Sequence, residues 1–110
     1  MTIFQKIIDR EIPADIVYED DHTLAFRDIS PKAPTHVLVI PKKAVAGVSS
    51  LEETDEHLAG KLLLSAAEVA RRLDLHDYRL VVNNGAGAGQ TVFHLHIHIL
   101  GGRPLGWPPG

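Results

Sequence analysis

Three histidines alternate with apolar residues in the segment His94-Leu95-His96-Ile97-His98-Ile99-Leu100. Successive side chains of a β-strand point to opposite faces, so a strand here places the three imidazoles on one face and the apolar side chains on the other. The apolar face belongs against the core, whereas the histidine face must meet polar groups, because burying three unpaired imidazoles is costly. A face that only meets water could carry any polar residue, so it would not require histidine at three alternating positions. The spacing therefore predicts a histidine-dependent site.

Two chemistries fit such a site. Neighbouring histidines on one strand face lie about 6.6 Å apart, so two of them could share a zinc ion, with a further ligand from His36 or an acidic residue. All three on one ion would be strained. Alternatively, one imidazole attacks a phosphorus or acyl group while its neighbours orient it and bind the substrate. We favour catalysis, expect no metal or other cofactor, and expect a chelator to leave the melting temperature unchanged.

A glycine-rich loop, residues 83–91 (NNGAGAGQT), leads directly into the histidine segment. It is not a P-loop, because it lacks Gly-Lys-Ser/Thr, and it is not a dinucleotide fingerprint, because it precedes an expected strand rather than a helix. Glycine lets successive amides turn toward an anion. Alone the loop is equally typical of a flexible turn, but beside three histidines it predicts a phosphate-binding loop with a hydroxyl from Thr91. His36, at the start of an apolar strand, and Asp28, at the end of another, suit a functional or a structural role equally well.

These residues must be positioned by a small α+β fold. Helical spacing of apolar residues predicts a short helix over residues 2–10 and a long one from Ser50 or Thr54 to about Leu73. Strands are predicted over residues 15–19, 23–28, 36–40, 78–82 and 92–100. Because helices and strands do not alternate, we expect a mostly antiparallel sheet with the helices on one face, and not a doubly wound fold.

Length and composition narrow the class of protein. The 110 residues predict a single domain, 1–110, and 45% apolar with 23% charged residues is typical of a globular chain. The absence of cysteine excludes disulfides, thiolate zinc sites and cysteine nucleophiles. A net charge of −3 gives no reason to expect nucleic acid as a partner. No apolar run could span a membrane or serve as a signal peptide, so we expect a cytoplasmic protein.

The chain resembles the histidine triad (HIT) family, in particular its Hint branch of histidine triad nucleotide-binding proteins. The segment at 94–100 matches the family pattern His-φ-His-φ-His-φ-φ, where φ is apolar. Further segments that look like the family are DISP at 28–31, APTH at 33–36, VIPKK at 39–43, GGR at 101–103 and WPPG at 107–110. The resemblance extends from Thr2 to Gly110. It implies a five-stranded antiparallel sheet with two helices, and a homodimer in which two sheets join into one of ten strands.

The resemblance also implies an activity, the hydrolysis of purine nucleoside 5′-phosphoramidates and related aminoacyl or lysyl adenylates to a nucleoside monophosphate. Carried over by position, His96 is the nucleophile that forms a covalent nucleotidyl-histidine. The backbone carbonyl of His94 orients the His96 ring, and the His94 side chain continues the network toward His36. His98 binds phosphate oxygens. Thr91 lies near the leaving group, where many relatives have serine.

The implied substrate site comes from separate parts of the chain. Asp28 would bind the ribose hydroxyls and Ile29 would contact the nucleoside. The phosphate would be lined by Asn83, Gly89 and Gln90, and the base pocket would be formed by Ile3, Phe4, Ile7, Ile12 and Phe26. The tail carrying Trp107 would reach the partner subunit's site. The alternatives are a dinucleoside polyphosphate hydrolase or nucleotidyl transferase of the same superfamily, a non-enzymatic nucleotide-binding regulatory protein, and a zinc-binding protein.

Overall fold

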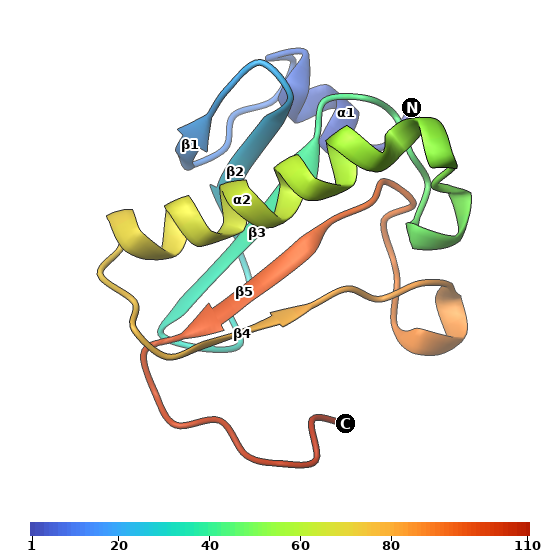
Figure 1. The fold of residues 1–110 in the computed structure, drawn as a ribbon. Coiled ribbons are helices and arrows are strands. Elements are labelled where there is room, and N and C mark those ends of the chain that lie inside the picture. Colours follow the sequence, from blue (N-terminus) through green and yellow to red (C-terminus); the bar gives the residue numbers. More distant parts are fainter.

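Five strands form one antiparallel sheet in the order β1-β2-β3-β5-β4, in a computed structural model that describes all 110 residues (Figure 1). The strands are β1 (Ile16–Glu19), β2 (Thr23–Arg27), β3 (Thr35–Pro41), β4 (Tyr78–Val81) and β5 (Ile97–Gly101). The central strand β3 is buried along nearly its whole length, as expected for a continuous β-branched and apolar run. The predicted α+β class and antiparallel sheet are confirmed.

The two helices cover opposite faces of the sheet, so the prediction that both lie on one face is wrong. Helix α2 (Glu56–Arg72) packs in front of the sheet in Figure 1, and α1 (Ile3–Ile8) lies behind it. One core, under α2, is formed by Ala25, Val37, Val39, Val45, Leu62, Ala66, Val69, Leu95, Ile97 and Ile99. The other, under α1, is formed by Phe4, Ile7, Leu24, Phe26, Leu38 and Ile40. Because β2 and β3 are apolar at consecutive positions, both faces of the sheet require a cover.

Strand β5 begins at Ile97, five residues later than the predicted start of the strand over residues 92–100. Its partner β3 ends at Pro41, which has no backbone N–H to continue the ladder. Beyond that point the chain makes other bonds, and the Leu95 amide donates to the Val45 carbonyl at 2.6 Å. The long helix begins at Glu56, near the Thr54 alternative, after 3₁₀ turns at Val48–Ser50 and Glu53–Asp55. None of the helices has the length and apolar character needed to cross a membrane.

A polar network ties the turn between β1 and β2 to α2. The Asp20 carboxylate accepts hydrogen bonds from the amides of His22 and Thr23 and from the Tyr18 hydroxyl. The hydroxyls of Thr23 and Ser65 lie 2.8 Å apart, and both residues are fully buried. Burial raises the pKa of Asp20, but these hydrogen bonds outweigh it and hold the pKa well below its usual range. The contribution of Asp20 to the stability of the fold is therefore greatest while Asp20 is ionised.

Candidate functional site

The histidines gather on the face of the sheet that α1 covers. His98 lies opposite Leu38 in the β3–β5 register, and His96 lies just before β5. The Phe4 ring of α1 packs edge-on against His96, with ring centroids 5.0 Å apart, and lies 6.3 Å from His94. The alternating apolar residues of this segment belong to the core under α2, which confirms the predicted division of the two faces.

Backbone groups fix the orientation of His94 and His96. The His94 carbonyl lies 2.7 Å from Nδ1 of His96. A carbonyl can only accept, so His96 carries a proton on Nδ1, and in the neutral form of the ring the lone pair is on Nε2. The His94 ring donates from Nε2 to the Pro41 carbonyl at 2.8 Å and is 98% buried, with a pKa that burial lowers.

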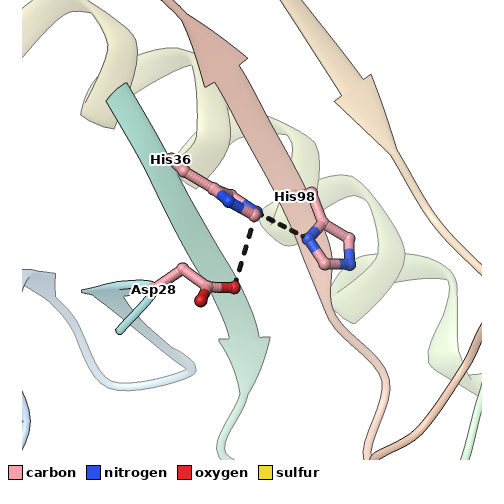
Figure 2. A group of neighbouring side chains, drawn as sticks. All are labelled: Asp28, His36 and His98. Atoms are coloured by element: carbon pink, nitrogen blue, oxygen red, sulfur yellow. Dashed lines mark hydrogen bonds and ion pairs between the residues drawn. The ribbon is translucent and has the colours of Figure 1, made fainter. Parts of the chain in front are cut away.

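The implied continuation of the network from the His94 side chain toward His36 is therefore wrong, because the His94 ring bonds to the Pro41 carbonyl. The buried Pro41 carbonyl at the end of β3 requires a donor, and the His94 side chain supplies it. His36 instead meets His98. Its Nε2 lies 2.9 Å from Nδ1 of His98 and 3.5 Å from Oδ2 of Asp28, as Figure 2 shows. The Lys32 amide donates to its other nitrogen, Nδ1, at 3.0 Å.

Burial keeps the paired rings of His36 and His98 neutral near pH 7. Burial lowers the pKa of His36, against the opposing effect of the Asp28 carboxylate. Burial, helped by the neighbouring His96 and His36, lowers the pKa of His98 to about 4. A neutral imidazole has one donor and one acceptor nitrogen, so the hydrogen-bond partners decide what each ring offers to a ligand.

A cavity of about 320 Å³ opens beside these histidines, between α1, the end of β2 and the middle of β3. It is lined by ten of the predicted site residues, namely Ile3, Phe4, Ile7, Ile12, Phe26, Asp28, Ile29, Thr91, His96 and His98. The other lining residues are Pro13, Ala14, Arg27, Leu38 and Val92. A mostly apolar cavity with one carboxylate and two imidazoles at one end suits a flat apolar group joined to a polar, anionic one.

Comparison with known proteins identifies the family. The HIT domain model matches residues 9–105. The chain is 64% identical to an uncharacterized HIT-like protein of Synechocystis over an alignment 110 positions long, which covers 99% of this chain and 96% of that protein. It is 51% identical to a 14 kDa zinc-binding protein of Zea mays, over 99% of this chain and 88% of that protein. The chain belongs to the HIT domain family.

Solved structures agree with this membership. A HIT family hydrolase from Legionella pneumophila superposes with a TM-score of 0.96 at 47% identity, and the match covers 100% of both chains. A HIT family hydrolase from Clostridium thermocellum superposes with a TM-score of 0.93 at 46% identity, over 96% of this chain and 93% of that one. The sheet and helices described above are thus those of HIT family hydrolases.

Three predicted phosphate-binding residues of this HIT domain, Asn83, Gly89 and Gln90, do not line the cavity. The Gln90 side chain is buried, accepts from the Gly85 amide and donates to the carbonyls of Ala46 and Val92. Its amide group is fully used in shaping the loop. Gly89 has φ +95°, a left-handed conformation that favours glycine. Gln90 and Gly89 thus shape the loop that ends at Thr91, and phosphate binding by Asn83, Gly89 and Gln90 stays a prediction.

Two contributors to the site carry no signal in the sequence. The Lys32 amide and the Pro41 carbonyl orient His36 and His94, but a backbone group is the same at every position. Only the fold determines which backbone groups remain without a ladder partner. The tail residue Trp107 is 84% exposed and is not among the residues that line the cavity in the single chain.

Proposed function

We propose that this HIT domain is a nucleotide-binding hydrolase of the Hint type. It cleaves the P–N bond of purine nucleoside 5′-phosphoramidates, and the corresponding bond of aminoacyl or lysyl adenylates, through a covalent nucleotidyl-histidine. The observation that carries the proposal is the free Nε2 lone pair of His96 at the polar end of the apolar cavity. A neutral imidazole held in this tautomer is a nucleophile ready to attack phosphorus.

The cavity suits a purine nucleoside. Its apolar end would take the base between the side chains of α1 and Phe26. The Asp28 carboxylate uses Oδ1 to accept from the Ser30 amide at 2.8 Å, which leaves Oδ2 for the ribose hydroxyls. This arrangement would place the 5′-phosphoryl group beside His96 and His98, whose ring centroids are 4.9 Å apart.

The reaction would proceed by two displacements on phosphorus. In the first, Nε2 of His96 forms a bond to phosphorus while the P–N bond breaks, and the leaving amine takes a proton from the Thr91 hydroxyl, which regains one from solvent. His98 donates a hydrogen bond to the phosphoryl oxygens as their charge grows. In the second, water attacks phosphorus and gives a proton to solvent, the P–His96 bond breaks to return the neutral His96 ring, and the nucleoside monophosphate leaves. Each step is easier than one direct attack by water.

The surface beside β4 supports the proposed homodimer. β4 is an edge strand, and Tyr78, Leu80 and Val82 are each more than a third exposed. Leu63 and Leu64 on α2 are 58% and 66% exposed. An apolar edge of this kind is a pairing hazard unless another chain covers it. Pairing of two such edges would join the sheets into one of ten strands and would bring a Trp107 tail toward the partner's cavity.

The cytoplasmic location expected from the sequence stays a prediction.

The deciding experiment is hydrolysis of adenosine 5′-phosphoramidate by the wild type and by His96→Ala, each with and without a chelator. We expect turnover that resists the chelator and is lost in His96→Ala, while AMP still binds. Faster turnover of a dinucleoside polyphosphate would favour the other enzymes of the superfamily. AMP binding without turnover of either substrate would leave a regulatory nucleotide-binding protein.

Zinc binding is a second candidate function, favoured by one observation. Asp28, His36 and His98 each offer a ligand atom, and these atoms lie within 4.8 Å of one another. One carboxylate oxygen and two imidazole nitrogens are ligands that zinc accepts. A bound ion would supply positive charge beside the cavity, and binding through the two nitrogens that now join His36 to His98 would break the hydrogen bond between them. Zinc titration, and melting with and without a chelator, distinguish a protein that holds zinc from one that does not. Under the hydrolase proposal, the chelator should leave the melting temperature unchanged.

A further inference from the structure

His36 lies next to the cavity but does not line it. It is 94% buried on β3, and its two ring nitrogens face the Lys32 amide and the His98 ring. Any effect of His36 on a bound ligand must therefore pass through His98. We propose, resting on the hydrolase function above, that His36 is a positioning residue that makes His98 present an N–H, rather than a lone pair, to the phosphoryl oxygens.

The argument follows the hydrogen bonds from the backbone outward. The Lys32 amide can only donate, so Nδ1 of His36 accepts and the His36 proton lies on Nε2. This N–H points at Nδ1 of His98 at 2.9 Å, which makes that nitrogen an acceptor. The His98 proton therefore lies on Nε2, the nitrogen turned away from His36 in Figure 2. One backbone amide thus determines the tautomer of a ring two residues removed in the hydrogen-bond chain.

Asp28 supports the same arrangement. Its Oδ2 lies 3.5 Å from Nε2 of His36, the nitrogen that already faces His98. A carboxylate attracts a proton to the nitrogen it faces, so Asp28 and the Lys32 amide both favour the proton on Nε2 of His36. The two contacts act on opposite sides of the same ring. Reversing the tautomer would break one hydrogen bond and place two lone pairs against each other in the second.

These hydrogen bonds give His96 and His98 opposite tautomers. A carbonyl, that of His94, gives His96 a free lone pair on Nε2. An amide, acting through one intervening imidazole, gives His98 an N–H on Nε2. The nucleophile and the donor to the phosphate can therefore be the same residue type, side by side. A lone pair on both rings would repel the phosphoryl oxygens, and an N–H on both would leave no nucleophile.

Three variants of the full chain test the proposal, all with a chelator present. His36→Leu removes the donor to His98, whereas the amide of His36→Gln can keep an N–H where Nε2 lies. Lys32→Pro removes the backbone N–H at the start of the chain of hydrogen bonds, and Lys32→Ala is its control, because both variants lose the side chain that donates to the Ser30 carbonyl. The matched control is His76→Leu, a histidine in an exposed turn. Imidazole ¹⁵N shifts report which nitrogen of His98 carries the proton, and steady-state kinetics separate kcat from KM.

We expect wild-type His98 to show a protonated Nε2 and an unprotonated, hydrogen-bonded Nδ1. In His36→Leu and Lys32→Pro the two shifts should move toward each other, and kcat should fall at least about tenfold with KM within about threefold, as for loss of one hydrogen bond at the reacting group. His36→Gln should recover kcat to within about threefold of the wild type, and His76→Leu should change nothing.

Two results would overturn the inference: a proton on Nδ1 of wild-type His98, or unchanged shifts and kcat in both His36→Leu and Lys32→Pro. If His36→Leu does not fold, Lys32→Pro decides. If the wild type hydrolyses no phosphoramidate, the proposed function fails, but the ¹⁵N shifts still decide whether His36 sets the tautomer of His98. The two failures are therefore distinguishable.

Discussion

The histidine at position 94 contributes to the site through its backbone, whereas its side chain serves the fold. The ring is 98% buried and donates to the Pro41 carbonyl, while the carbonyl that orients His96 belongs to the main chain. His94→Leu keeps the bulk of the side chain and removes the donor. His94→Gln keeps an N–H that can reach the same carbonyl. The two variants thus differ mainly in whether the Pro41 carbonyl is satisfied.

The size of the effect follows from that one group. Leaving a buried carbonyl without a donor costs about 1–3 kcal/mol. An unfolding entropy of about 2.1 cal/mol/K per residue gives roughly 0.23 kcal/mol per kelvin for a chain of 110 residues, so the melting temperature of His94→Leu should fall by about 4–13 °C. His94→Gln should lose less than half of that.

The assays are thermal unfolding and phosphoramidate hydrolysis at a temperature where all variants are folded. We expect folded His94→Leu to retain kcat within about tenfold of the wild type, since the carbonyl at position 94 is still present. An unchanged melting temperature would refute the structural role of the side chain. A folded His94→Leu as inactive as His96→Ala would refute the claim that the main chain alone orients the nucleophile.

Other expected outcomes concern the fold and the nucleoside. Asp20→Asn should lower the free energy of unfolding by about 1–3 kcal/mol at pH 7. Because the pKa of Asp20 is depressed in the folded state, this difference should be present above about pH 4 and should shrink as pH falls below it, which denaturant titration at several pH values would show. A difference that keeps its full size from pH 7 down to pH 2 would contradict the role of the charge. Gly102→Ala should destabilise by about 1–3 kcal/mol, because φ is +90° and the new Cβ would lie 2.9 Å from Cβ of Pro34. Gly60→Ala, in α2 with open space around it, should instead stabilise by about 0.5–1 kcal/mol in the same melting assay. Asp28→Asn should raise KM about tenfold for a ribonucleoside phosphoramidate but leave KM for its 2′,3′-dideoxy analogue unchanged, and equal effects on both would exclude contact with the ribose.

The spacing of apolar and polar residues in the sequence predicted which side chains face the core and which face the site. The alternation at 94–100 placed Leu95, Ile97 and Ile99 in the core under α2, and the residues expected around a base do line one cavity. The resemblance to the HIT family added the pairing of distant segments, such as α1 with Thr91. Spacing within a single segment could not have supplied that pairing.

Backbone geometry accounts for the expectations that were wrong. A strand over residues 92–100 would have continued the ladder to Pro41, but proline ends the pairing and frees its carbonyl for the His94 ring. Placing both helices on one face overlooked the consecutive apolar residues in β2 and β3, such as Leu24 next to Ala25. In the first case the outcome depended on which backbone groups the neighbouring strand left unsatisfied, and a single segment does not record that. In the second case the signal was present in the sequence, as apolar residues at consecutive positions of β2 and β3.

The cavity wall formed by α1 has a consequence for how ligand binding can be observed. Helix α1 has only six residues, too few to be stable by itself, and its buried residues Phe4 and Ile7 both line the cavity. A nucleoside in the cavity would therefore add contacts to the least self-sufficient element of the fold, while α2 packs on the other face. Amide hydrogen exchange should slow in α1 when AMP binds and stay unchanged in α2. The rate at which α1 moves away from the cavity would then limit how quickly the nucleoside monophosphate leaves.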